Sequence, residues 1–207
     1  MKILIYMAKE NRIMSLNSYE NEMIKVLRNS LGGEQGAVSY TNGMEGIPKV
    51  DILLAVNSPC EGEMTASTLG LVNRTTGIKA KDKDIRAEIV TCFYPSMKDV
   101  PRLLTSLGIH LLQSEVPYRP GSVYQNIVSQ YFPNSEMKHL ILTLPPQIWK
   151  ENITMVPIED SFLTVLCAHP ISDAEYEYIM KNGLSALDQI FAEKGTDMSD
   201  YERKSVI

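Results

Sequence analysis

The stretch Ser161-Phe-Leu-Thr-Val-Leu-Cys167, followed by Ser172-Asp-Ala-Glu175, marks the passage from a buried strand into an amphipathic helix. Ser172 and Glu175 form a capping box, in which the serine hydroxyl accepts from a backbone amide of the first turn and the glutamate bonds back to the serine amide. The pattern predicts one helix over residues 173–194, ended by Gly195. Its apolar residues recur every three or four positions and form one stripe: Tyr176, Ile179, Met180, Leu184, Leu187, Ile190 and Phe191.

Gly183 lies inside this stripe. A glycine in the middle of a helix costs about 1 kcal/mol relative to alanine. We therefore expect a close approach of another backbone at Gly183 to compensate.

Upstream of this block the sequence alternates between helical and strand-like patterns. Apolar spacing predicts helices over residues 18–31 and 100–114, with a further short helix over 123–131. Strands are predicted at 50–56, 64–73, 85–94 and 139–144, and the polar, glycine-rich segment 36–49 is predicted as a loop.

These elements favour an α+β fold. Short, turn-like connections separate the strands at 50–56, 64–73 and 85–94, which favours an antiparallel meander. Strands cluster between helices without strict βαβ alternation, so we expect a mostly antiparallel mixed sheet flanked by helices. A length of 207 residues fits a single domain, with residues 1–17 forming an extra edge strand or a loosely held N terminus.

Bulk composition excludes several classes of function. The formal net charge of −5 argues against general nucleic-acid binding, which needs a basic surface, and favours attraction to a basic partner. No apolar run approaches the roughly 20 residues that span a bilayer, so we expect no membrane segment. Three widely spaced cysteines are interpreted as reduced thiols, which suits a cytoplasmic protein.

No motif for metal binding or catalysis is found. His110, His139 and His169 are not at metal-ligand spacing, and there is no Cys-x-x-Cys pair, so no metal and no cofactor are expected. The nucleophile elbow Gly-x-Ser-x-Gly and a phosphate-binding loop are both missing. The sequence therefore favours a protein that is not an enzyme.

Asp51 interrupts an apolar strand, and a buried carboxylate is costly unless it is paired. We expect it to face water or to pair with a cation, Arg86 or Arg203. Arg86 and Glu88 are two apart on a strand and share one face. All four residues are predicted to be structural, and a ligand cleft at Asp51, Arg86 and Glu88 is the alternative.

Aromatic residues on predicted loops are the better lead. Aromatic side chains on loops often anchor interfaces, because they bury a large area at low entropic cost. The alternative is that they pack as lids over the core. Together with an acidic pair, they give the predicted partner-binding residues Tyr118, Tyr124, Trp149, Glu159 and Asp160.

The C-terminal block also resembles a known family. It contains an apolar strand, an acidic pair, Lys-Asn-Gly, Leu-x-x-Leu and a late arginine: Phe162–Leu166, Glu175, Glu177, Tyr178, Lys181-Asn182-Gly183, Leu184, Leu187, Phe191 and Arg203. This pattern is similar to the C-terminal signature of the Suppressor of Fused domain. Shorter resemblances lie at 50–56, Ser67-Thr-Leu-Gly-Leu71, Arg86-Ala-Glu-Ile-Val90 and 139–146, so the likeness extends over residues 18–207.

The resemblance implies a protein that binds another protein. Animal members of the family sequester a transcription factor with help from a second, C-terminal domain, whereas bacterial single-domain members resemble immunity proteins encoded beside secreted toxins. We therefore expect a cytoplasmic immunity protein, or antitoxin, that binds a toxin domain. Two alternatives stay open: a regulatory adaptor that adds a peptide at a sheet edge, and a small hydrolase with a cleft near Asp51, Arg86 and Glu88.

Overall fold

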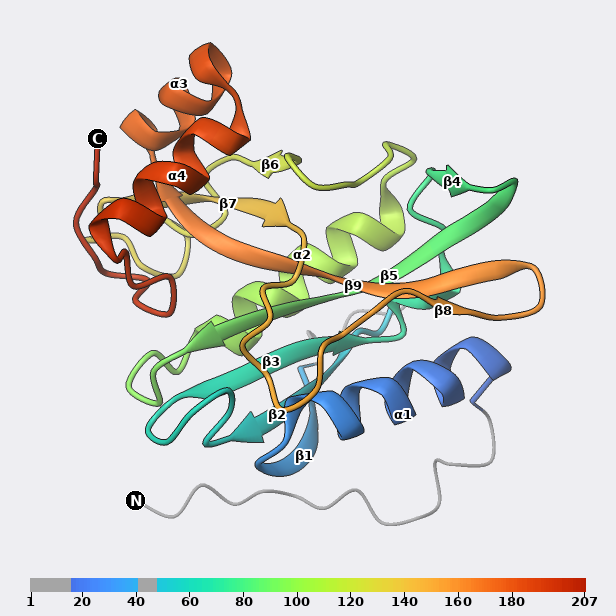
Figure 1. Ribbon diagram of the computed structural model, residues 1–207. Helices are drawn as coiled ribbons and strands as arrows, with labels where there is room; N and C mark the ends of the chain where they lie inside the picture. The colour runs from blue at the N-terminus through green and yellow to red at the C-terminus, as the bar shows by residue number, and fades with distance from the viewer. Residues whose placement is uncertain (1–15, 41–47) are drawn as a thin grey trace.

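The computed structural model describes residues 16–40 and 48–207, so nearly all of the predicted N-terminal segment 1–17 lies outside the described residues. The described part forms one nine-stranded sheet with helices on both faces (Figure 1). The helices are α1 (Ser18–Leu31), α2 (Val100–Gln113), α3 (Asp173–Asn182), α4 (Leu184–Lys194) and the 3-10 turn η2 (Leu71–Asn73). The strands are β1 (Glu34–Ser39), β2 (Asp51–Val56), β3 (Met64–Leu69), β4 (Lys79–Ala80), β5 (Lys83–Phe93), β6 (Val123–Tyr124), β7 (Met137–Thr143), β8 (Val156–Pro157) and β9 (Ser161–Ser172).

The sheet is mixed and mostly antiparallel, which confirms the predicted α+β class. The strand order is β1-β2-β3-β5-β9-β7-β6, with β4 paired to β5 and β8 paired to β9. The predicted meander of β2, β3 and β5 is antiparallel. In the described residues only β5 and β9 run parallel, with Asp84 opposite Ser161 and Val90 opposite Cys167. These are also the two longest strands, and they form the centre of the sheet.

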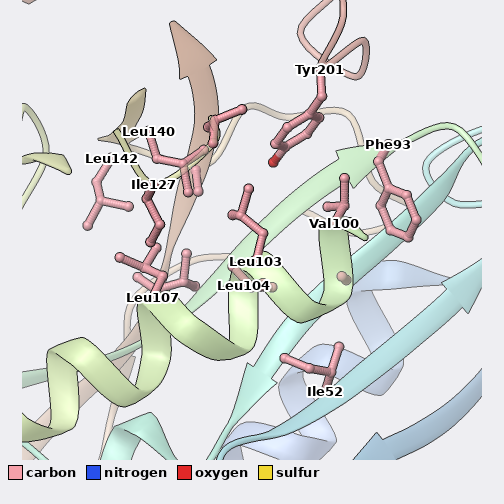
Figure 2. Packing of buried hydrophobic residues seen from close by; sticks show 14 of the residues in the cluster. Ile52, Phe93, Val100, Leu103, Leu104, Leu107, Ile127, Leu140, Leu142 and Tyr201 are labelled. Atoms are coloured by element: carbon pink, nitrogen blue, oxygen red, sulfur yellow. The ribbon is translucent and has the colours of Figure 1, made fainter. Parts of the chain in front are cut away.

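One face of the sheet is covered by α2. Four leucines of this helix are fully buried against it: Leu103, Leu104, Leu107 and Leu111. Figure 2 shows three of them beside Ile52 of β2, Phe93 of β5 and Leu140 and Leu142 of β7. Each buried leucine contributes about 1.5–3 kcal/mol relative to an exposed one, so this face holds the larger part of the core.

The opposite face is covered at its two ends and not in its middle. Helix α1 begins at a capping box of Asn17 and Glu20 and buries Met23, Leu27 and Leu31. Helices α3 and α4 pack over the other end, where Leu187 meets Ile141 of β7 and Ile171 of β9. Figure 1 shows α1 on one side of this face and the α3–α4 pair on the other, with α2 behind the sheet.

Two local predictions were wrong. Residues 36–39 of the segment predicted as a loop belong to β1, which pairs with β2 from Glu34 opposite Val56 to Ser39 opposite Asp51, and residues 41–47 of that segment lie outside the described residues. A polar edge strand has no buried face, so it lacks the apolar alternation that identifies strands. The predicted helix at 123–131 is the short strand β6 followed by turns, and the backbone of Asn126 has a φ of 59°, which a right-handed helix does not allow.

The predicted C-terminal helix is in fact two helices, α3 and α4, separated at Gly183. Gly183 has φ 86° and ψ 163°, a conformation that is essentially confined to glycine. No atom lies within 4 Å of the position that a Cβ would occupy, so the expected close backbone approach is wrong. The backbone angle, rather than crowding, explains why glycine stands here.

A buried ion pair fixes the C-terminal tail against this end of the sheet. Nη1 and Nη2 of Arg203 donate to the two carboxylate oxygens of Glu175 over 2.6 and 2.8 Å. The two side chains are 7 and 0 % exposed. Glu175 also accepts from the backbone amides of Ser172 and Val206, and Arg203 donates to the carbonyl of Pro170. The predicted capping box at Ser172 is confirmed, and its glutamate has a second role as the anchor of the tail.

Gly183→Ala should destabilise the protein by about 1–3 kcal/mol, because alanine is strained at this backbone conformation although it has space there. Urea unfolding of this variant and of Ser185→Ala, an exposed control in the next turn, measures the cost. An unchanged unfolding midpoint for Gly183→Ala would show that the backbone strain is absent.

Arg203→Met should cost about 3–5 kcal/mol of unfolding free energy, because it leaves Glu175 charged and buried without its partner. The double variant Glu175→Gln with Arg203→Met should recover part of this loss. Glu22→Gln, which breaks the exposed pair with Lys25, serves as the control and should change stability by less than about 1 kcal/mol. Equal losses in the single and the double variant would contradict a coupled pair.

Candidate protein-binding groove

A groove lies on the strip of sheet that the helices leave uncovered. Alternate residues of β9 point to this face: Leu163, Val165 and Cys167 pack towards α1, whereas Ile171 packs under α3 and α4. Cys167, at the edge of the cluster beside α1, and His169 form part of the floor, beside Ile141 and Thr143 of β7. The groove has a volume of about 920 Å³.

The walls come from segments that are far apart in the sequence. One wall is α4 and the turn after it, with Leu184, Phe191 and Met198. The other is the segment that leaves β7 and crosses the front of the sheet towards α1 (Figure 1), which contributes Leu144, Pro146 and Ile148. This segment is held at its far end by Trp149, whose indole Nε1 donates to the hydroxyl of Thr65 over 2.9 Å.

The rim of the groove is acidic. Among the described residues that line it, the charged ones are Glu63, Asp188 and Asp197, and no lysine or arginine is present. Partial burial raises the pKa of Asp188. Asp197 accepts a 2.6 Å hydrogen bond from the hydroxyl of Tyr94, and this bond raises the pKa of Tyr94 to about 12.

The floor of the groove is uncharged at neutral pH. Burial raises the pKa of the Cys92 thiol to about 12 and that of Cys167 well above its ordinary value. Burial, together with the positive charge of Arg203, lowers the pKa of His169 to about 4. The site is therefore an apolar, neutral floor between carboxylates, a surface that suits an apolar group with a positive charge beside it.

Two of the predicted partner-binding aromatics are buried in the core. Tyr118 is 0 % exposed, and its hydroxyl donates to the carbonyl of Ala87 over 3.2 Å. Trp149 is 6 % exposed and packs with Leu27 and Leu31 of α1. The alternative that these aromatics pack as lids over the core describes both residues, and their burial removes them from the surface that a partner can contact.

The other three predicted residues lie at the surface but not together. Tyr124 is half-buried on the edge strand β6, where its ring meets that of His110 edge-on at 5.8 Å. Glu159 and Asp160 are exposed in the turn between β8 and β9, and Asp160 accepts from the hydroxyl of Tyr19 over 2.7 Å. Tyr124 lies apart from the acidic pair, because β6 pairs with the part of β7 that is opposite the last residues of β9, whereas Glu159 and Asp160 precede the first residue of β9.

Arg86 is held by structural contacts. Its guanidinium lies 4.1 Å from the centre of the Tyr19 ring and donates to the carbonyls of Val72 and Asn73 and to the hydroxyl of Ser161. Asp51 accepts from the hydroxyl of Ser39 on the neighbouring strand β1. Both placements agree with a structural role.

Glu88 holds the turn that follows β3. Its carboxylate accepts from the hydroxyl of Thr68 over 2.5 Å and from the backbone amides of Gly70, Leu71 and Val72. Complete burial raises the pKa of Glu88 to about 7, and these hydrogen bonds partly oppose that rise. Asp51 and Glu88 line a cavity of about 70 Å³, far below the 300–1,000 Å³ of typical small-molecule sites.

The described residues hold no cluster of three or more histidine, cysteine or carboxylate side chains suited to a metal ion. In the same part of the chain, no helix combines the length and the apolar character needed to cross a bilayer.

Sequence reasoning missed the groove because its residues come from six separate segments. The one local signal was Leu144-Pro-Pro146, where an apolar residue and two prolines follow a strand. The sequence spacing of the three cysteines did not predict that Cys60, Cys92 and Cys167 all line this groove.

Comparisons with known proteins agree on one family. The model of the Suppressor of fused protein (SUFU) family matches residues 46–204. Immunity protein YqcF of Bacillus subtilis (strain 168) is 28% identical over 189 residues, which are 91% of this chain and 97% of the relative.

Solved structures share the fold. A suppressor of fused homologue from Neisseria gonorrhoeae FA 1090 superposes with a TM-score of 0.61 at 16% identity, over 94% of this chain and 98% of that chain. The structure of a Sufu–Fu complex gives a TM-score of 0.60 at 12% identity, over 90% of each chain. Drosophila Suppressor of Fused gives 0.57 at 14% identity, over 90% of this chain and 50% of that chain.

The buried carboxylate of Glu88 should make stability depend on pH. Its pKa in the folded protein, about 7, is above the 4.5 of an unfolded chain, so the folded state binds the extra proton between these values. The contribution of Glu88 to stability is therefore complete below pH 4.5 and lost as the pH rises to 7. His169 acts in the opposite sense, because its lowered pKa makes stability fall as the pH drops from 6.5 towards 4.

Chemical unfolding between pH 4 and 8 separates the two effects. Relative to the unaltered protein, Glu88→Gln should steepen the rise of unfolding free energy with pH between 4.5 and 7, because only the His169 effect then remains. The exposed control Glu177→Gln should leave the pH profile unchanged. Parallel profiles for Glu88→Gln and the unaltered protein would contradict a raised pKa of Glu88.

Proposed function

The chain belongs to the Suppressor of fused family, and we propose that it is a non-enzymatic immunity protein that binds and neutralises a toxin domain made by the same cell. The observation that carries this proposal is the similarity to an immunity protein over almost the full length of both chains. Insertion or loss of a domain would leave part of one chain unmatched. The match covers 91% of this chain and 97% of the relative.

The structure supports a role in which the protein binds a partner through its surface and catalyses no reaction. The predicted polar residues are used inside the fold, with Glu88 holding a turn, Arg86 binding two carbonyls and Arg203 paired with Glu175. The groove is an exposed feature with the size and chemistry for recognition. A toxin domain bound at the groove would be inhibited because this chain sterically blocks access to its substrate. Such inhibition needs no catalytic group in this chain.

Charge supports a basic partner. The formal net charge of −5 and the acidic rim of the groove attract a positively charged toxin domain and speed its encounter. We place the encounter in the cytoplasm, before the toxin is exported. The three cysteines are free thiols, which suits a reducing compartment.

The two alternatives have weaker support. A hydrolase centred on Asp51, Arg86 and Glu88 would need a substrate to enter a cavity of about 70 Å³, and the guanidinium of Arg86 would have to leave its carbonyl partners. An adaptor that pairs a peptide with a sheet edge would use the outermost strands, β1 or β6. In β6 only Val123 and Tyr124 form a ladder, so that edge offers few backbone groups for pairing.

The test is binding and protection with the toxin domain encoded in the neighbouring open reading frame. We expect the purified domain to form a complex of about nanomolar affinity or tighter, measured by calorimetry, and coexpression to rescue growth. Raising the salt concentration from 0.05 to 0.5 M should slow association at least tenfold and change dissociation little. Lack of binding to the products of the neighbouring genes, or turnover of a small molecule that depends on Glu88, would contradict the proposal.

A further inference from the structure

We propose that the groove between α4 and the 144–148 segment receives a loop or extended segment of the partner protein that carries an apolar side chain beside a lysine or arginine. This inference rests on the proposed function and adds the place and the chemistry of the contact.

The apolar part of the argument comes from exposed hydrophobic residues around the groove. Leu144 and Ile148 are 70 and 48 % exposed, and they face a floor that contains buried Ile141 and the thiol of Cys167. Contiguous apolar surface of this kind on a soluble protein marks a binding site. An apolar side chain of the partner that entered the groove would remove these groups from water at a gain of about 25 cal/mol per Å².

The charge of the occupant follows from the acidic rim. Asp188 is exposed on α4 and makes no hydrogen bond and no ion pair with any described residue, and partial burial raises its pKa. Its carboxylate is therefore available to pair with a lysine or arginine of the partner. Glu63 and Asp197 lie on the same rim and add to the negative potential.

Other occupants fit this chemistry less well. A nucleic acid or an anionic metabolite would bring negative charge to a rim whose described charged residues are all carboxylates. A purely apolar ligand would cover Asp188 and leave it without a partner, which costs free energy. A protein segment with an apolar residue next to a cation satisfies the floor and the rim together.

The walls are firm enough to preorganise such a site. Phe191 of α4 lies 5.3 Å from the guanidinium of Arg203, so the buried ion pair also supports this wall. Trp149 ties the opposite wall to Thr65 of β3. Because both walls are fixed before binding, the partner does not have to order them, which favours affinity.

The native thiol of Cys60 reports occupancy directly. Cys60 is the one exposed cysteine among the described residues and lies on the lining of the groove, whereas Cys92 and Cys167 are buried. We expect the purified toxin domain from the neighbouring gene to slow alkylation of Cys60 by iodoacetamide at least fivefold, as followed by mass spectrometry of the peptide that contains it.

Charge reversal identifies the contact. Asp188→Lys should weaken binding of the toxin domain at least tenfold, and Leu144→Ser at least fivefold, each measured by calorimetry. Glu193→Lys makes the same change of charge on the same helix outside the groove and should stay within twofold. Urea unfolding confirms that the variants are folded, and both substituted positions are exposed, so stability should change little.

The outcomes separate the two proposals. If the unaltered protein binds the toxin domain but Asp188→Lys and Leu144→Ser bind equally well and Cys60 reacts at the same rate, the groove assignment is overturned and the immunity function stands. If only Glu159→Ala with Asp160→Ala abolishes binding, the contact lies at the turn between β8 and β9, and the groove is again excluded. If the unaltered protein does not bind at all, both proposals fail.

Discussion

The buried pair of Glu175 and Arg203 is the constraint on which the rest of the surface depends. Two charges withdrawn from water are stable only as a well-bonded pair, and here the carboxylate accepts from both nitrogens of one guanidinium and from two backbone amides. The pair joins the last residues of the chain to the start of α3 and to the end of β9. It thereby holds α3 and α4 over one end of the sheet and defines one wall of the groove.

The antiparallel pairing of β9 with β7 gives the groove its floor, because His169 lies opposite Ile141 and Cys167 lies opposite Thr143. This part of β9 extends under the gap between α1 and the α3–α4 pair. On the α2 side, one helix and the segments around it cover the corresponding region. The two faces of one sheet therefore differ, because one is filled by the core and the other has a strip that no helix covers.

Much of the fold follows from local sequence signals, and the exceptions have physical causes. Apolar periodicity predicts α1 and α2, because each of these helices buries one face, and turn residues between apolar runs place the strands of the meander. The break at Gly183 escapes this reasoning, since the apolar spacing from Ile179 to Leu187 continues across it. The parallel pairing of β5 and β9 also escapes, because about seventy residues separate the strands and their contact is decided by tertiary packing. Tyr118 and Trp149 show the same limit for sites, because residues on an irregular segment carry no periodicity that distinguishes a lid from an exposed anchor.

Our central claim is that this protein acts by binding a partner protein at the uncovered strip of the sheet. Hydrogen–deuterium exchange of the protein, free and in complex with the toxin domain, tests this most directly. We predict that binding slows exchange of the amides in residues 141–148 and 184–199, which flank the groove. Protection confined to β1, β6 or the turn between β8 and β9, with no change in those two segments, would contradict the claim.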